Sequence, residues 1–221
     1  MDETRTDKHS ITLEGHGLTL RRGDALVFDR LCFRLSAGGL LVVRGPNGSG
    51  KSSLLRAVAG FLPLEDGVIR CNGARFEARS DEADLRCFWY SPADGLAGAL
   101  TAAQNLSLAP DAGSELQIKT KLAAYDPFVI SGFLDQPVRS LSTGQRQRVA
   151  LTRLCFAPSD RCLWLLDEPN SALDEAGHKA LEGVLAAHQA AGGLCLMASH
   201  HQISDRLKPA YLDLSDTAED R

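Results

Sequence analysis

The stretch Gly45-Pro46-Asn47-Gly48-Ser49-Gly50-Lys51-Ser52 decides how this chain is interpreted. It matches the pattern G-x-x-x-x-G-K-[ST], in which glycines let backbone N–H groups turn inward around phosphate oxygens. The apolar residues 40–44 before it have the length of a buried strand, and an apolar-periodic helix is expected from about Lys51 to Phe61, stopped by Pro63. A strand before and a helix after are the context that a phosphate-binding loop requires, whereas a glycine-rich hairpin would merely turn the chain.

The residues of this stretch have separate roles in holding a nucleotide and a metal ion. Lys51 would bridge the outer phosphates, and the hydroxyl of Ser52 would ligate Mg²⁺. The backbone N–H groups would hold phosphate oxygens at the positive end of the helix. The expected phosphate-binding set also includes the residue after the motif, and it consists of Gly45, Pro46, Asn47, Gly48, Ser49, Gly50, Lys51, Ser52 and Ser53.

A second motif, Leu163-Trp164-Leu165-Leu166-Asp167-Glu168, is an apolar strand that ends in two carboxylates. Asp167 would complete the Mg²⁺ shell, and Glu168 would accept a proton from an attacking water or orient it. An acidic strand end that only caps the next helix is commoner when this feature is taken alone. Pro169 and the turn at 171–174 keep the two carboxylates in a loop and favour the catalytic interpretation.

Apolar segments without polar alternation predict the fold class. Residues 40–44, 162–166 and 194–198 are such segments, and helices separate them, which indicates an α/β fold with a mainly parallel core sheet covered by helices on both faces. Looser alternation over 11–35 predicts an N-terminal antiparallel β subdomain. A helix should begin near Thr143 and end before Pro158.

The remaining helix and the domain limits follow from caps and chain breakers. Asp174 is the expected N-cap of a helix whose buried face consists of Leu181, Val184, Leu185 and His188. One domain should span 11–215, with a small helical subdomain at about 95–158 that is broken into short helices at Gly113, Pro127 and Pro137. The polar ends, 1–10 and 216–221, should be flexible tails.

Composition excludes several classes of protein. The chain has 221 residues and a net charge of −4, and its basic residues come singly or in pairs, so binding to nucleic acid is not expected. It lacks an apolar run of about 18 residues that could cross a membrane, and a signal peptide is not expected. The 6 cysteines form no C-x-x-C pair, which predicts free thiols and neither disulfides nor a zinc site.

The segment Leu141-Ser142-Thr143-Gly144-Gln145, which leads into a basic helix, resembles the signature sequence of the ATP-binding cassette (ABC) ATPases. By itself it is also an ordinary helix start, since Ser142 and Gln145 have the spacing of a capping box. The phosphate loop, the two carboxylates, the turn at 171–174 and His200 at a strand end follow in this family's order. The resemblance covers residues 11 to about 214 and identifies a P-loop NTPase with the ABC cassette fold.

The resemblance implies a site that two chains share, with ATP and Mg²⁺ as cofactors. In a head-to-tail homodimer, the phosphate loop of one chain would face Ser142, Gly144 and Gln145 of the other across ATP. Lys51, Glu168 and His200 would form the catalytic set, with His200 bonded to the terminal phosphate and helping Glu168 to position the water. Asp174 would cross the dimer and report the state of one site to the other, whereas the adjacent His201 has no expected role.

Two departures from the family pattern affect binding and coupling. Many relatives have an aromatic residue that stacks on adenine at about the position of Arg22, and Phe28 is the nearest alternative here. A guanidinium can also stack on the base, so Arg22 is the expected adenine neighbour. The glutamine that usually follows the strand near Trp89 is missing, and Pro92 stands in its place. Ser91, Asp94 or a water would have to substitute for it, and hydrolysis would be slower or differently coupled.

Three local stretches, 135–138, 93–106 and 191–200, are similar to the branch of the family that serves bacterial cytochrome c maturation. This resemblance implies a peripheral subunit at the cytoplasmic face of the bacterial inner membrane that couples ATP hydrolysis to haem handling or export. Its partners would be integral-membrane permease subunits (CcmB/CcmC-like), and it would contact the membrane only through them. The alternatives are a cassette for another substrate such as a lipid or nutrient, a soluble ABC-type ATPase, or a nucleotide switch that does not hydrolyse ATP.

Overall fold

The computed structural model describes residues 11–80, 83, 85–91, 95–109, 111–157 and 161–214. Its centre is a five-stranded sheet in the order β6-β7-β8-β3-β9, and every pair of neighbouring strands in it is parallel. The strands of this sheet are β3 (Leu40–Arg44), β6 (Arg86–Tyr90), β7 (Cys162–Asp167), β8 (Leu194–Ala198) and β9 (Ala210–Asp213). The parallel core sheet that the sequence predicts is confirmed.

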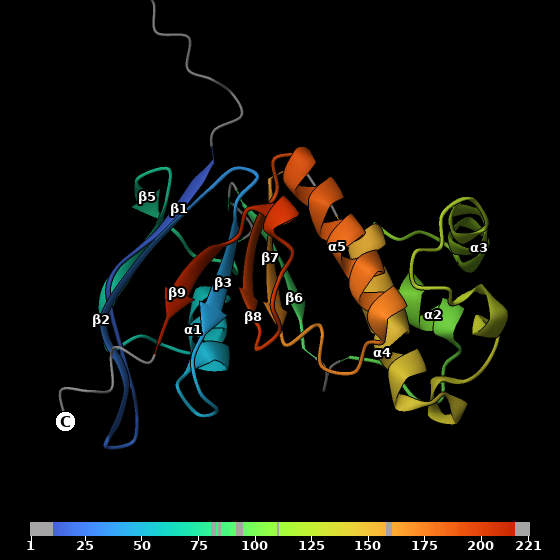
Figure 1. Ribbon diagram of the computed structural model, residues 1–221, viewed down its shortest axis with the longest axis horizontal. Helices are drawn as coiled ribbons and strands as arrows, with labels where there is room; N and C mark the ends of the chain where they lie inside the picture. The colour runs from blue at the N-terminus through green and yellow to red at the C-terminus, as the bar shows by residue number, and fades with distance from the viewer. Residues whose placement is uncertain are drawn as a thin grey trace, which may run out of the picture.

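A second, antiparallel sheet has the order β2-β1-β4-β5 and covers one side of the molecule (Figure 1). Its strands are β1 (Thr12–Arg22), β2 (Ala25–Ser36), β4 (Asp66–Cys71) and β5 (Ala74–Arg75). Gly67 allows β4 to approach β1 closely, because a Cβ at this position would lie 2.5 Å from the carbonyl oxygen of Gly17. The antiparallel strands expected from residues 11–35 are confirmed.

Helices cover both faces of the parallel sheet (Figure 1). The α-helices are α1 (Lys51–Val58), α2 (Ala102–Ser107), α3 (Glu115–Ala124), α4 (Thr143–Thr152) and α5 (Glu175–Ala190). The 3₁₀ turns are η1 (Ser131–Phe133), η2 (Val138–Ser140), η3 (Arg153–Cys155) and η4 (Asp205–Leu207). Asp174 is the N-cap of α5, as expected, and its side chain accepts a hydrogen bond from the N–H of Gly177 at 2.9 Å.

Helix α1 ends earlier than the sequence pattern predicts. The prediction placed its end near Phe61 with Pro63 as the stop, but the last helical residue is Val58. Gly60 adopts φ 71°, and the N–H of Phe61 then donates to the carbonyl of Arg56 at 2.8 Å. A left-handed residue and this backward hydrogen bond close a helix without a proline.

Alternate side chains of the parallel strands enter two different cores. In β3, Leu41 and Val43 pack with α1 and the antiparallel sheet, whereas Leu40 and Val42 pack with α4 and α5. Since both faces are covered, the strands are apolar at nearly every position, which is why they lack polar alternation in the sequence. The predicted buried face of α5 is confirmed, and it consists of Leu181, Val184, Leu185 and His188.

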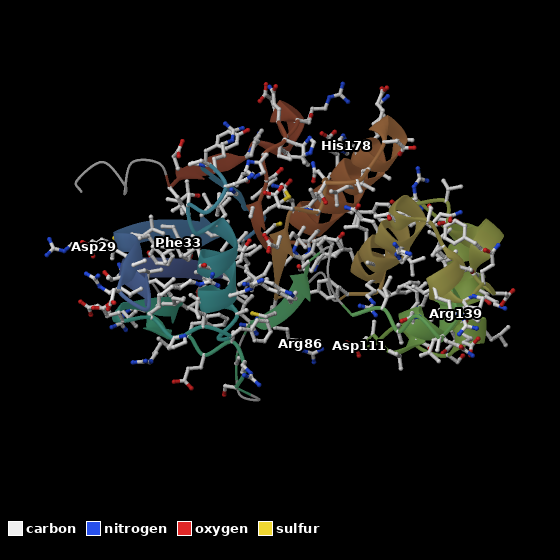
Figure 2. All side chains as sticks on the ribbon, turned by 90° about the horizontal axis from the view of Figure 1, so that it is seen from below. Asp29, Phe33, Arg86, Asp111, Arg139 and His178 are labelled. Carbon is white, nitrogen blue, oxygen red and sulfur yellow. The ribbon has the colours of Figure 1, made fainter. Side chains whose placement is uncertain are left out.

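The short helices α2 and α3 lie beyond α4, away from the antiparallel sheet (Figure 1). Thr101 and Ser114 cap them through capping boxes with Gln104 and Gln117. Asp111, between the two helices, forms an ion pair of 3.4 Å with Arg86 at the start of β6 (Figure 2). In the described part of the chain, no helix combines the length and the apolar character needed to span a bilayer.

Some predictions fall outside the described residues. These are the tails 1–10 and 216–221, and the positions Pro92, Asp94 and Pro158. Ser91, which precedes the first of these internal positions, is described and is buried.

Candidate functional site

The predicted phosphate-binding, metal-binding and catalytic residues meet at one edge of the parallel sheet because β7, β8 and β3 are neighbours and parallel. The phosphate loop follows β3, Glu168 follows β7, and His200 comes two residues after β8. The carboxyl ends of parallel strands are where ligands bind in open α/β sheets.

The phosphate loop depends on glycines that adopt positive φ angles. Gly45, Gly48 and Gly50 have φ angles of 140°, 85° and 102°. Gly50 is also the N-cap of α1 and offers no side chain to the first N–H groups of the helix, and a Cβ there would collide with Val27. The N–H groups at the start of α1 therefore have no side-chain cap, which leaves them available to an anion.

Lys51 is held inside this loop. Its ammonium group donates to the carbonyl oxygens of Gly45 at 2.9 Å and Pro46 at 3.0 Å, and only 7% of the residue is exposed. Carbonyl oxygens are neutral acceptors, so phosphate oxygens would be stronger partners for the same ammonium group. The lysine is thus placed to exchange loop carbonyls for phosphates.

Ser52 and Asp167 form a pair of oxygen donors that fits a divalent cation. The hydroxyl of Ser52 donates to the carboxylate of Asp167 at 2.8 Å, across the gap between α1 and the end of β7. Asp167 is 5% exposed. Mg²⁺ prefers hard oxygen ligands and is commonly held by one or two side chains together with substrate phosphates and water, so these residues fit it.

Glu168 and His200 face each other beside this pair. His200 Nε2 lies 3.1 Å from Glu168 Oε1, a contact that is an ion pair only when the imidazole is protonated, and its geometry is not that of a hydrogen bond. Glu168 adopts φ 48°, and its N–H donates to the carbonyl of Ala198 at 3.0 Å. Carboxylate Oε1 of Glu168 accepts no hydrogen bond in the described structure, so it can accept one from a water molecule.

A cavity of about 580 Å³ joins these elements. The predicted residues that line it are Arg22, Asn47, Gly48, Gly50, Lys51, Ser52, Ser53, Glu168 and His200. Val27, Arg56 and Ser171 line it as well and were not predicted. Arg56 could have been found from helical spacing, because it follows Ser52 by four residues on α1.

Phe28 is not available to adenine. The sequence suggested it as the nearest aromatic alternative to Arg22, but its side chain is fully buried in the core beneath the antiparallel sheet. It pairs with Leu20 across β1 and β2, and both side chains point inward. Val27, the residue before Phe28, has the opposite orientation and reaches the cavity.

The predicted signature residues lie outside this cavity, at the start of α4. The hydroxyl of Ser142 accepts a hydrogen bond from the N–H of Gln145 at 3.2 Å, and Gln145 Oε1 accepts one from the N–H of Ser142 at 2.8 Å. The capping box suggested by the sequence is therefore present. A hydroxyl that accepts one bond keeps its own proton for donation, so the cap leaves Ser142 able to bind a phosphate oxygen.

Gly144, Asp174 and four residues of the predicted phosphate and metal sites also do not line the cavity; the four are Gly45, Pro46, Ser49 and Asp167. Gly144 has space around it, since a Cβ there would have the carbonyl oxygen of Ala172 as its nearest neighbour at 3.7 Å. Asp174 caps α5 and forms an ion pair of 2.8 Å with Arg148 of the same chain. The hydrogen bond from Gly177 is the main reason that the pKa of Asp174 is lowered, and Arg148 adds to this effect.

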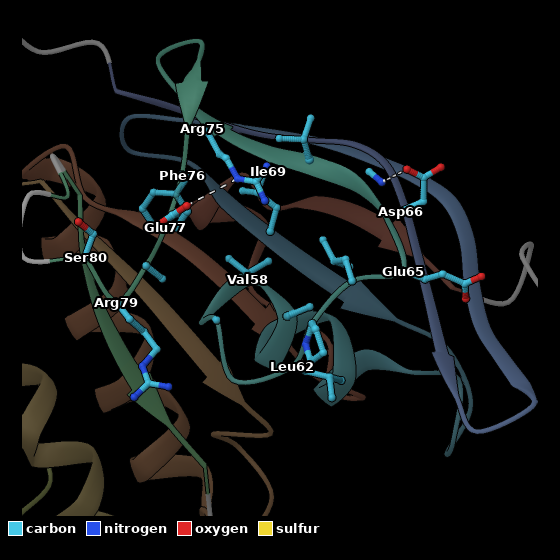
Figure 3. A pocket seen from close by; sticks show the side chains of 17 residues that line it. Val58, Leu62, Glu65, Asp66, Ile69, Arg75, Phe76, Glu77, Arg79 and Ser80 are labelled. Atoms are coloured by element: carbon cyan, nitrogen blue, oxygen red, sulfur yellow. Dashed lines mark hydrogen bonds and ion pairs between the residues drawn. The ribbon is translucent and has the colours of Figure 1, made fainter.

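A larger cavity, of about 680 Å³, lies between the end of α1 and the strands β4 and β5 (Figure 3). Val58, Ile69 and Phe76 form apolar parts of its wall, and Arg75 lies 3.7 Å from Glu77 at its rim. None of the predicted site residues lines it. We assign the chemistry to the smaller cavity because that one combines glycine-rich backbone, lysine and carboxylate.

The fold and the site define an ATP-binding cassette. Residues 28–171 match the ABC transporter family, and the chain belongs to this family. It is 41% identical over 196 residues to the cytochrome c biogenesis ATP-binding export protein CcmA of Paramagnetospirillum magneticum. The aligned region covers 87% of this chain and 89% of that protein. The protein of the same name from Pseudomonas putida is 37% identical over 206 residues, or 93% of this chain and 97% of that protein.

Solved structures agree with this fold. A putative ABC transporter ATP-binding protein from Pyrococcus furiosus superposes with a TM-score of 0.74 at 22% identity, covering 93% of this chain and 98% of that one. A bacterial Atm1-family ABC exporter with ATP bound gives a TM-score of 0.73 at 21% identity, covering 93% of this chain and 38% of that one. At these identities the likeness shows the fold alone.

Proposed function

We propose that this chain is the ATP-hydrolysing subunit of an ABC transporter complex that couples ATP hydrolysis to haem handling or export in cytochrome c-type biogenesis. The observation that carries the proposal is similarity at 37 to 41% identity, over 87 to 93% of the chain, to proteins named for cytochrome c biogenesis and export. The hydrolytic part is supported by Lys51, Ser52 and Glu168, which line one cavity, and by Asp167, which is hydrogen-bonded to Ser52.

In this reaction the chain's own residues would bind, orient and deprotonate. Lys51 and the loop N–H groups hold the phosphates of ATP in line for attack. Mg²⁺, held by Ser52 and Asp167, supplies charge neutralisation between the phosphates when bound. Glu168 accepts a proton from the attacking water or orients it, and His200 beside it donates to the terminal phosphate and helps Glu168 to position the water.

The separation of α4 from the cavity supports a homodimer in which each site is shared. In one chain, Ser142, Gly144 and Gln145 do not line the cavity that holds Lys51. Head-to-tail pairing would bring the N-terminus of α4 and the Ser142 hydroxyl to the terminal phosphate as donors. Each chain would consist of one ABC domain at 11–215, which includes a helical subdomain at about 95–158.

The base of the nucleotide would lie beside Arg22. This residue and Val27 line the cavity at the end that the antiparallel sheet contributes. A guanidinium stacks on a planar ring and would replace the aromatic residue that many ABC ATPases use. Recognition of the base would then depend on stacking and be weakly selective.

An exposed aromatic cluster is the proposed contact with the membrane subunits. Phe61 is 54% exposed, its ring lies 5.5 Å from that of Trp89, and the guanidinium of Arg79 lies 5.9 Å from the Phe61 ring. Aromatic residues and arginine are enriched in protein interfaces. The partners would be integral-membrane permease subunits (CcmB/CcmC-like), which would hold the chain at the cytoplasmic face of the bacterial inner membrane.

Purification from native membranes in mild detergent tests this function and this surface together. We expect the chain to carry small haem-handling membrane subunits with it, and Phe61→Asp to release them while retaining ATP binding. Leu116→Asp is the matched control, because Leu116 is 75% exposed but lies on α3. Recovery with a lipid or nutrient permease, or recovery without membrane subunits, would contradict the assignment.

A further inference from the structure

Two consecutive residues of α4 connect this helix to the loop that follows β7. Gln147 is 7% exposed, and its Nε2 donates to the carbonyl oxygen of Pro169 at 2.8 Å. Arg148 donates from Nη2 to both carboxylate oxygens of Asp174, each at 2.8 Å. We refer to Gln147 and Arg148 as the α4 brace. It holds the loop just after Glu168 and again where α5 begins.

The first of these contacts lies next to a strained residue. Glu168 adopts φ 48°, a left-handed conformation that is sterically unfavourable for a non-glycine residue. Such a conformation persists only where the surroundings enforce it. The N–H of Glu168 is bound to Ala198 of β8, and the carbonyl of the following Pro169 is bound to Gln147. The carboxylate is therefore positioned from β8 on one side and from α4 on the other.

Gln147 also lies beside the end of β6. Burial raises the pKa of Tyr90, and the neighbouring Gln147 side chain partly opposes this rise, although among the described residues the Tyr90 hydroxyl has no hydrogen-bond partner of standard geometry. Tyr90 is 4% exposed and is the last residue of β6. The buried amide of Gln147 thus lies between β6, which leads to residue 91, and the loop that carries Glu168.

Helix α4 carries both the brace and Ser142, so it connects the loop after Glu168 to the residue that would contact the ATP of the partner subunit. The N-cap of α4 is Ser142, and Gln147 follows five residues later, about 8 Å along the same helix. A helix of this length moves as a rigid unit, so a displacement at its N-terminus reaches Pro169. In the head-to-tail dimer of the proposed function, on which this step rests, Ser142 serves the ATP bound by the partner subunit, whereas Glu168 serves the ATP bound by its own chain.

We propose that Gln147 and Arg148 are positioning residues that couple the two ATP sites of the dimer. They make the placement of Glu168 in one site depend on the contact of α4 with ATP in the other. Loss of the brace in one chain would slow hydrolysis in the site that uses Glu168 of that chain. It would leave nucleotide binding unchanged, because neither residue lines the nucleotide cavity.

Mixed dimers of two differently tagged chains, purified on both tags, test this directly. One chain carries Glu168→Gln. Only the site that uses Glu168 of the other chain can then hydrolyse ATP. With Gln147→Met in the chain that keeps Glu168, we expect kcat to fall about tenfold with KM for ATP within about twofold. With Gln147→Met in the Glu168→Gln chain instead, we expect kcat to stay within about twofold of the mixed dimer without it.

Equal slowing from both placements, slowing only from the second, or no slowing would overturn the proposal. Gln189→Met is the matched control, because it removes an amide that donates to the carbonyls of Gly38 at 2.9 Å and Leu207 at 3.1 Å, away from the nucleotide cavity. If it slowed hydrolysis as much, the effect would be general destabilisation and the proposal would fail.

Arg148→Lys provides a second variant should Gln147→Met fail to fold. It keeps the charge, but lysine has a single terminal nitrogen, whereas Arg148 binds Asp174 from Nη2 and the carbonyl of Phe128 from Nη1 at 3.1 Å. Lysine cannot hold both partners in this geometry, so the same dependence on placement is expected. Dimers with Glu168→Gln in both chains separate the two hypotheses. Hydrolysis by these dimers at the parent's rate would contradict the proposed base, whatever the brace does.

Discussion

His188 is a buried histidine that the nucleotide site does not use. Its ring stacks on Trp164 at 3.7 Å between centroids with 8° between planes, and its Nε2 lies 3.0 Å from the carbonyl oxygen of Leu194. Burial lowers the pKa of His188 to about 4, although the hydrogen bond with the Leu194 carbonyl and the nearby backbone of Cys162 act in the opposite direction. The folded chain therefore holds the neutral imidazole across the physiological pH range.

This depressed pKa predicts a loss of stability in acid. His188 is protonated below about pH 6.5 in the unfolded chain, but only below about pH 4 in the folded chain. The stability that the neutral ring contributes is therefore fully present above pH 6.5 and is lost as the pH falls from 6.5 to 4. Between pH 7.5 and pH 4.5 the parent should lose roughly 2 to 3 kcal/mol more unfolding free energy than His188→Phe. Urea unfolding of both proteins at the two pH values measures the difference, and equal losses would refute the prediction.

Residue chemistry is where the sequence was most informative and also where it missed contacts. The motif spacing placed Lys51, Ser52 and Asp167 together because the first two lie in the first turn of α1 and Asp167 ends β7. Local patterns do not show which way a strand side chain points, so Phe28 was considered for the cavity although it is buried and Val27 lines it. The left-handed backbone of Glu168 also depends on β8, which lies far along the chain.

In helix α5 and just after it, two glycines differ in how well their surroundings would accept a side chain. Gly183 is exposed within the helix, and a Cβ there would meet nothing within 4 Å. Gly193, just beyond the helix, packs directly against the His188 ring, so a Cβ there would collide with it. The two positions should therefore respond in opposite directions to the same methyl group.

Gly183→Ala should raise the unfolding free energy by about 0.5 to 1 kcal/mol, because alanine loses less backbone entropy than glycine in a helix. Gly193→Ala should lower it by roughly 1 to 3 kcal/mol through overpacking against His188. Thermal and urea unfolding of the two variants measure both effects. A stabilising Gly193→Ala, or a clearly destabilising Gly183→Ala, would contradict the described packing of α5.

Element boundaries followed from the sequence where a local signal was present. Asp174 was predicted as the N-cap of α5 because a capping side chain acts within its own turn, and the structure agrees. The end of α1 was misplaced because Gly60, rather than the more conspicuous Pro63, terminates the helix. The α4 brace could not be predicted, since Gln147 and Pro169 are 22 residues apart and meet only through packing.

At the scale of the whole molecule, the strand order β6-β7-β8-β3-β9 creates the site. It places strands from distant parts of the chain side by side, so that three loops meet at one edge. Local periodicity could predict a parallel sheet but not this order, and the ABC resemblance was what implied the arrangement. The same order leaves α4 and its signature residues outside the cavity, which is why one chain contains half of each proposed site.

Complementation between two inactive chains tests this shared site most directly. Lys51→Ala removes the cation from the phosphate loop, and Ser142→Asp keeps an N-cap on α4 but places a carboxylate against the terminal phosphate. Each chain alone should be inactive, and thermal unfolding should show that both are folded. In an equal mixture, half of the dimers are mixed and each has one of its two sites intact, so hydrolysis should recover to at most about a quarter of the parent's rate. The α4 brace should keep it below that ceiling, because the intact site uses Glu168 of the chain that carries Ser142→Asp. A mixture no more active than its separate components would contradict the shared site.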